Sequence, residues 1–87
     1  MISPNDRVIM VSGANRGIGL GVARHLVKRG YRVSLGARDI TTMDAATAGA
    51  KAGQVACFPY DALDLDLAEA WVTGTAQRFG GIDGLVN

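Results

Sequence analysis

Ser12-Gly13-Ala14-Asn15-Arg16-Gly17-Ile18-Gly19 is the stretch that decides the fold of this 87-residue chain. An apolar run at positions 8–11 precedes it, and a helical pattern of apolar residues at 18–29 follows it. The predicted order is therefore strand, glycine-rich turn, helix. Gly13 permits the tight turn, Gly17 lets a phosphate approach the backbone, and Gly19 lets the helix lie close to the sheet. Free N–H groups and the positive dipole end at the helix start attract a pyrophosphate, so the stretch predicts a dinucleotide-binding turn.

The glycine spacing leaves alternatives that the neighbouring residues help to weigh. The common dinucleotide pattern is G-x-G-x-x-G, whereas this chain has G-x-x-x-G-x-G. Three glycines alone also fit an ordinary strand-to-helix turn. A P-loop requires Lys and then Ser or Thr after its last glycine, but Gly19 is followed by Leu20 and Gly21. The strand before and the helix after favour nucleotide binding.

Apolar runs and helical patterns alternate along the rest of the chain. We expect strands at 7–11, 32–36, 54–60 and 82–87, and helices at 18–29, 40–52 and from an Asp64 or Asp66 cap to residue 79. We expect Trp71 to pack in the core. The order β-α-β-α-β-α-β predicts an α/β fold with a doubly wound parallel sheet and strand order 3-2-1-4. A cofactor is expected at the carboxyl ends of the strands.

The composition excludes several classes of protein. Nine basic and eight acidic side chains nearly balance, which suggests no nucleic-acid or membrane surface. The single cysteine, Cys57, excludes an internal disulfide and a cysteine metal cluster, and no metal site is predicted. The first residues lack the apolar core of a signal peptide, and no apolar run approaches the roughly 20 residues of a membrane helix. We therefore expect a soluble, cytoplasmic protein.

The octet S-G-A-N-R-G-I-G resembles the T-G-x-x-x-G-I-G signature of the short-chain dehydrogenase/reductase family. Residues 58–64, F-P-Y-D-A-L-D, resemble the family's third strand, and residues 77–87 resemble its fourth strand, which runs into an N-N-A-G motif. The three segments follow in the family's order at its spacing. The resemblance implies that residues 1–87 are the N-terminal half of a dinucleotide-binding Rossmann domain. It also implies that the remainder of the polypeptide, or a second fragment, completes the domain.

The resemblance also implies which residues bind the cofactor. Asp61 would accept a hydrogen bond from the adenine amino group, although a carboxylate that only caps a turn is the alternative. The Ala62 backbone would flank the ring, and Asn87 would lie near the adenosine ribose and tie the central strands together. Ser12 stands where the family usually has Thr. The predicted cofactor-binding residues are Gly13, Asn15, Arg16, Gly17, Ile18, Gly19, Arg38, Asp61, Ala62 and Asn87.

The choice between NADP and NAD depends on the end of the second strand. Proteins that bind NAD place a carboxylate there for the ribose hydroxyls, whereas proteins that bind NADP offer Arg to the 2′-phosphate. In the family's register Ala37 occupies the carboxylate position, Arg38 follows it, and Arg16 can reach the same phosphate. NADP(H) is therefore the predicted cofactor. A register slip of two residues would place Asp39 at the ribose and favour NAD(H) instead.

The family transfers hydride between the nicotinamide cofactor and a carbonyl or alcohol substrate, with a catalytic Y-x-x-x-K motif. Neither tyrosine carries that motif, because Leu35 lies four residues after Tyr31 and Asp64 four residues after Tyr60. No residue here is assigned as catalytic. The fourth strand should form an apolar edge, and the intact protein should be a homo-oligomer. The alternatives are a non-catalytic nucleotide-binding or regulatory Rossmann module and a structural protein that has lost the cofactor.

Overall fold

The computed structural model of the chain describes residues 6–87. The first residues of the chain, in which no signal peptide is expected, lie almost entirely outside these residues. No helix within 6–87 is long and apolar enough to cross a membrane. The elements in chain order are β1 (Val8–Ser12), α1 (Gly17–Lys28), β2 (Arg32–Ala37), the 3₁₀ turn η2 (Ile40–Thr42), α2 (Asp44–Thr47), β3 (Val55–Pro59), α3 (Leu65–Phe79) and β4 (Gly84–Val86).

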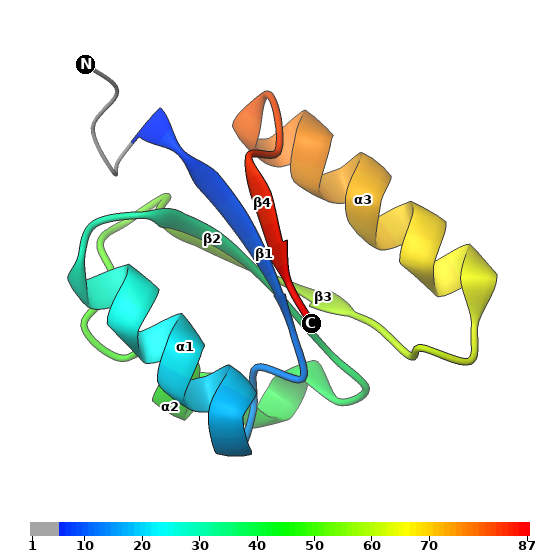
Figure 1. Cartoon of the computed structure of the whole chain (residues 1–87), viewed down its shortest axis with the longest axis horizontal. Helices are drawn as coiled ribbons and strands as arrows, with labels where there is room; N and C mark the ends of the chain where they lie inside the picture. The colour runs from blue at the N-terminus through cyan, green and yellow to red at the C-terminus, as the bar shows by residue number, and fades with distance from the viewer. Residues whose placement is uncertain (1–5) are drawn as a thin grey trace.

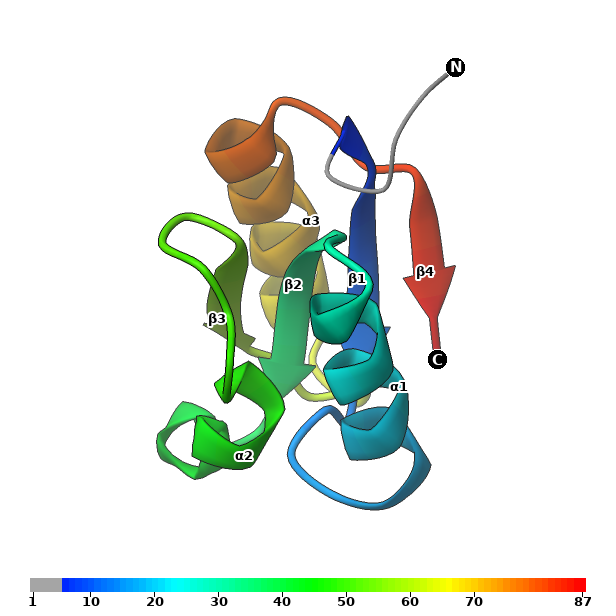
Figure 2. The ribbon, with the colours of Figure 1, turned by 90° about the vertical axis from the view of Figure 1, so that its left-hand side faces the viewer.

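The four strands form one parallel sheet in the order β3-β2-β1-β4, which confirms the predicted α/β fold and strand order. Helices α1 and α2 cover one face of the sheet and α3 covers the other (Figures 1 and 2). The central strands are therefore buried on both faces, and Val11, Val33 and Leu35 are completely buried. This double burial explains why residues 8–11 of β1 are continuously apolar rather than alternating.

A small polar network fixes α3 to the sheet. The Trp71 side chain is 3% exposed, which confirms the expected core position, and its Nε1 donates to Ser34 Oγ at 2.9 Å. Ser34 Oγ also lies 2.6 Å from Thr75 Oγ1. Both Ser34 and Thr75 are completely buried. These hydroxyls satisfy one another and the indole N–H, so the interface between α3 and β2 contains polar groups without leaving one unpaired.

The predicted helix over 40–52 was wrong. Only the short elements η2 and α2 form there, and residues 48–54 are irregular. Local hydrogen bonds compete with a continuous helix, because Asp39 accepts from both the backbone N–H and the hydroxyl of Thr41. Gly49 then adopts a left-handed φ of 81°, which ends the helical path. The side chain of Gln54 accepts from Lys51 N at 2.9 Å and closes the following turn.

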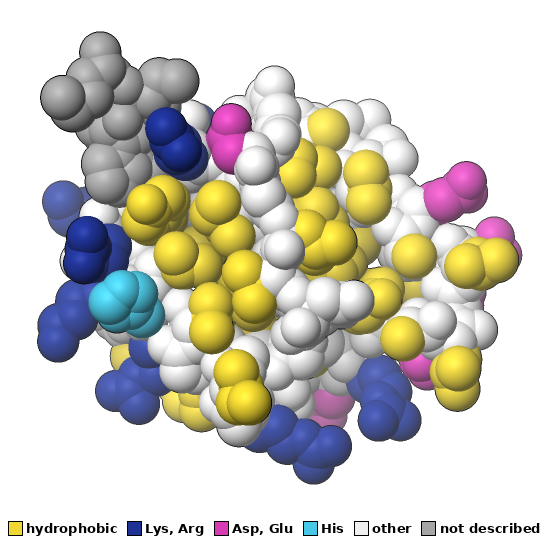
Figure 3. All heavy atoms as spheres, viewed as in Figure 1, with side chains coloured by type: hydrophobic (Ala, Val, Ile, Leu, Met, Phe, Trp, Pro, Cys, Tyr) yellow, Lys and Arg dark blue, Asp and Glu magenta, His cyan; other side chains and the backbone are white. Residues whose placement is uncertain are grey.

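Strand β4 is an edge strand held to β1 at its start. The Asp83 carboxylate accepts from Val8 N at 2.7 Å, and Asp83 N donates to Val8 O at 2.8 Å. Farther along, Leu85 is 60% exposed. Figure 3 shows hydrophobic side chains gathered on the face where β4 lies between α1 and α3. The expected apolar edge is therefore present in the fold.

Gly74 lies where α3 contacts β3, and the structure predicts that Gly74→Ala destabilises the chain. A Cβ at this position would lie 2.5 Å from Phe58 Cε1, which is too close for any real contact. We expect a loss of about 1–2 kcal/mol in the free energy of unfolding, because steric overlap exceeds the gain in helix propensity. Urea denaturation measures the change.

Gly21→Ala is the matched control, because Gly21 is also within a helix but has no atom within 4 Å of its would-be Cβ. This substitution should stabilise the chain by about 0.5–1 kcal/mol. Equal stabilisation by both substitutions would contradict the packing of α3 against Phe58.

Candidate cofactor-binding site

The turn between β1 and α1 requires glycine for two different reasons. Gly13 and Gly17 have positive φ values of 61° and 60°, which side chains disfavour. Gly19 has an ordinary φ, but a Cβ there would overlap the Gly13 carbonyl. The first turn of α1 therefore lies directly against the end of β1. This agrees with the predicted close approach of the helix at Gly19. The group that Gly19 approaches is the backbone carbonyl of Gly13, in the same turn.

The start of α1 is open to an anion. Arg16 is its N-cap, with an extended backbone, and among the described residues no side chain caps the first turn. No acidic residue lies in that turn either. The N–H groups of Gly17, Ile18 and Gly19 have no partner within the helix, and no atom lies within 4 Å of where a Gly17 Cβ would be. The residues present therefore fit a diphosphate at this end of the helix.

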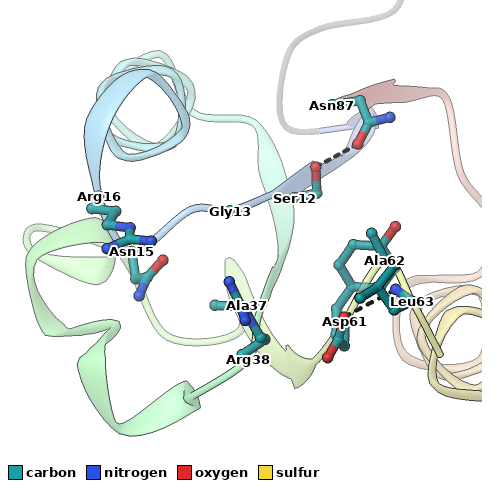
Figure 4. Close-up of a pocket in the computed structure, with 11 residues that line it drawn as sticks. Ser12, Gly13, Asn15, Arg16, Ala37, Arg38, Asp61, Ala62, Leu63 and Asn87 are labelled. Carbon is teal, nitrogen blue, oxygen red and sulfur yellow. Dashed lines mark hydrogen bonds between the residues drawn. The ribbon is translucent and has the colours of Figure 1, made fainter.

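A cleft of about 380 Å³ lies beside this turn, at the carboxyl ends of the strands. Figure 4 shows Asn15 and Arg16 on one side of the cleft, Asp61 and Ala62 on the other, and Arg38 between them. The predicted positions Gly17, Ile18 and Gly19 lie outside the lining, in the first turn of α1, where the Ile18 side chain is 87% exposed. The lining residues are Ser12, Gly13, Asn15, Arg16, Ala37, Arg38, Tyr60, Asp61, Ala62, Leu63 and Asn87.

Two side-chain hydrogen bonds fix the rim of the cleft. Ser12 Oγ donates to Asn87 Oδ1 at 2.7 Å and so joins the ends of β1 and β4. The hydroxyl thus bonds across the sheet rather than within its own turn. Asn15 Nδ2 donates to Thr42 Oγ1 at 3.0 Å, which holds the glycine-rich turn against η2. Both predicted asparagines therefore have a structural role before any ligand is considered.

The end of β2 brings a cation, but no acidic side chain of its own, to the cleft. Ala37 is the last residue of β2, and its carbonyl accepts from Tyr60 N at 2.9 Å. Arg38 follows, exposed and lining the cleft. Asp39 does not line it. Its carboxylate caps η2, and the hydrogen bonds from the Thr41 hydroxyl and N–H hold the pKa of Asp39 below its usual value.

Asp61 has one oxygen committed to the fold. Its Oδ1 accepts from Leu63 N at 2.9 Å and forms the turn that follows β3. The alternative role of capping a turn therefore accounts for one oxygen of this carboxylate. Within residues 6–87, Oδ2 accepts no hydrogen bond. Tyr60 and Leu63 line the same side of the cleft and were not predicted as site residues. The sequence could have indicated Tyr60, because it ends the expected strand and directly precedes the predicted site residue Asp61.

The hydrogen bond between Ser12 and Asn87 generates a prediction about stability. Ser12→Ala removes the donor and should lower the free energy of unfolding by about 0.5–1.5 kcal/mol. Ser12→Thr keeps the hydroxyl and should keep most of that stability. Chemical denaturation of both variants measures the difference, and equal losses for Ala and Thr would mean that the hydroxyl does not join β1 to β4.

Comparison with known proteins agrees with this geometry. Residues 7–87 match the sequence profile described as short chain dehydrogenase. Agropine synthesis reductase of Rhizobium rhizogenes is 44% identical over 80 residues, covering 92% of this chain and 18% of that protein. Galactitol 2-dehydrogenase of Agrobacterium fabrum is 39% identical over 84 residues, covering 95% and 32%. The chain thus spans between about a fifth and a third of the length of these relatives.

The fold comparison gives the same result. A metagenomic short-chain oxidoreductase, solved in complex with NADP, superposes with a TM-score of 0.80 and 34% identity. The superposition covers 92% of this chain and 37% of that structure. Fold, glycine-rich turn and sequence similarity agree, and the chain belongs to the short-chain dehydrogenase family.

Proposed function

We propose that this chain is the NADP(H)-binding portion of a short-chain oxidoreductase that acts on a small carbonyl or alcohol substrate. The bound nicotinamide supplies or accepts the hydride in such a reaction. The chain's own contribution is binding and orientation, since the start of α1 offers uncapped N–H groups to the pyrophosphate. The proposal assigns none of the described residues to proton transfer.

The end of β2 is the observation that carries the preference for NADP(H). Arg38 and Arg16 line the same cleft, whereas Ala37 offers no carboxylate to the ribose hydroxyls. Asp39, whose carboxylate would favour NAD(H), accepts hydrogen bonds from Thr41 instead. Two guanidinium groups can share the charge of a 2′-phosphate through charge-assisted hydrogen bonds. The NADP-bound structure of a similar protein gives additional support.

The opposite side of the cleft suits the adenine. The Asp61 Oδ1 atom is held by Leu63 N, which leaves Oδ2 to accept from the adenine amino group. Ala62 lies exposed beside it in the cleft lining. At the rim, Asn87 would approach the adenosine ribose. We therefore propose that the adenosine lies across the ends of β2 and β3.

We also propose that the intact protein covers the apolar edge at β4 with further polypeptide of the same domain. Leu85 and Ile82 are exposed there, at 60% and 38%, and an uncovered apolar strand edge favours unwanted pairing. The relatives have ample additional length for this purpose. A homo-oligomeric, cytoplasmic enzyme remains the expectation for that intact protein.

Arg38→Asp tests the proposed cofactor preference. The substitution removes one charge-assisted contact and adds repulsion, so the dissociation constant for NADPH should rise about 10- to 100-fold. The constant for NADH should change by less than about threefold, because NADH has no 2′-phosphate to repel. Isothermal titration calorimetry of the chain with both cofactors measures the two changes.

Arg24→Asp is the control, since Arg24 is an exposed arginine on α1 outside the cleft and undergoes the same change in charge. It should leave both affinities nearly unchanged. Equal weakening of NADPH and NADH by Arg38→Asp would mean that Arg38 does not contact the 2′-phosphate.

Asp61→Asn tests the proposed contact with adenine separately from the turn. The amide oxygen can still accept from Leu63 N, so the free energy of unfolding should be preserved. The second oxygen becomes an NH₂ donor, and NADPH should bind about tenfold more weakly. The hypoxanthine analogue of NADPH carries an oxygen acceptor in place of the amino group. It should therefore bind the Asn variant no more weakly than it binds the unaltered chain. An unchanged NADPH affinity in a stable Asn variant would refute the contact.

A further inference from the structure

Tyr60 is a cleft residue to which the proposed function gives no role. It directly follows β3, is half-buried, and lines the cleft next to Asp61. Its backbone N–H donates to Ala37 O at 2.9 Å, so its Cα is fixed to the end of β2. Tyr60 therefore occupies a defined position at the junction of β2 and β3, on the adenine side of the cleft.

The Tyr60 ring is supported from behind by Trp71. The two ring centroids lie 4.6 Å apart with an interplanar angle of 44°. Trp71 cannot easily withdraw, because its Nε1 is bonded to Ser34 Oγ at 2.9 Å. Its ring also packs against β2, where a Cβ on Gly36 would lie 2.9 Å from Trp71 Cζ2. A buried, hydrogen-bonded indole thus holds an aromatic ring at the edge of the cleft.

The chemistry of this ring fits a flat aromatic base. Aromatic side chains pack favourably against other rings and against nucleobases without needing a particular hydrogen-bond pattern. Within residues 6–87, no hydrogen bond to the Tyr60 hydroxyl is present, so the fold does not use its polar end. The part of the ring that Trp71 leaves uncovered is available to a ligand beside the Asp61 carboxylate.

We propose that Tyr60 forms an aromatic wall for the adenine ring, with Trp71 as the positioning residue behind it. This inference rests on the proposed function, because it assumes that the adenine lies on the Asp61 side of the cleft. The Tyr60 ring would then contribute to affinity through the base, whereas the start of α1 contributes through the phosphates. Tyr60 is in this view a binding residue and Trp71 acts only through it.

The test uses adenosine 2′,5′-bisphosphate and inorganic pyrophosphate as probes of the full 87-residue chain. Tyr60→Ala should weaken the adenosine probe about tenfold in calorimetric titrations, since one ring contact is lost. Pyrophosphate has no base, so its affinity should stay within about twofold. Because Trp71 is the only tryptophan, its fluorescence gives a second readout: the adenosine probe should alter its emission and pyrophosphate should not.

Tyr31→Ala is the matched control, because Tyr31 is also a half-buried tyrosine but packs against the core away from the cleft. It should lower the melting temperature and leave both affinities unchanged. If Tyr60→Ala does not fold, Tyr60→Leu keeps the apolar volume without the aromatic face and should show the same selective loss.

The outcomes separate this inference from the proposed function. A wild-type chain that binds neither probe overturns the proposed function and the wall with it. Wild-type binding of the adenosine probe with an equal affinity in Tyr60→Ala overturns only the wall. An equal loss for both probes assigns Tyr60 a general structural role and also overturns the wall.

Discussion

The close approach of α1 to the end of β1 is the constraint on which the site depends. Gly19 lies so near the Gly13 carbonyl that a Cβ there would overlap it. The helix must therefore begin immediately beyond the strand, with its first N–H groups at the edge where the parallel strands end. Because all four strands run in the same direction, the ends of β2 and β3 reach that edge too. The fold thereby brings residues from the ends of all four strands and from the turn before α1 to one cleft.

The two faces of the sheet are held by different kinds of interaction. The face under α1 and α2 is an apolar core around Val11, Val33 and Leu35. The face under α3 instead contains the hydrogen-bonded Ser34, Thr75 and Trp71. Apolar contacts tolerate small shifts, whereas a buried hydrogen-bond network requires one geometry. The more strictly defined face is the one that supports the side of the cleft with Tyr60 and Asp61.

The sequence predicted the strands, their order and most of the cleft lining, because continuous apolar runs and a glycine-rich turn are strong local signals. The helix over 40–52 was mispredicted because the many alanines of this segment favour a helix. Two local features, the Asp39 bonds to Thr41 and the positive φ of Gly49, override that propensity. Tyr60 was missed for another reason. A residue at a strand end can pack in the core or line the cleft, and the side chain that it contacts decides which. For Tyr60 that side chain is Trp71, 11 positions away in the sequence.

The pairing between β2 and β3 determines which residues at the end of β2 reach the cleft. Ala37 pairs with Pro59, and its carbonyl accepts from Tyr60 N. A slip of two residues, which would bring Asp39 to the cleft, would break this pairing. Asp39 is moreover held by Thr41, whose two hydrogen bonds stabilise the charged carboxylate and keep its pKa low. The strand register and the cap of η2 therefore both favour a guanidinium rather than a carboxylate in the cleft.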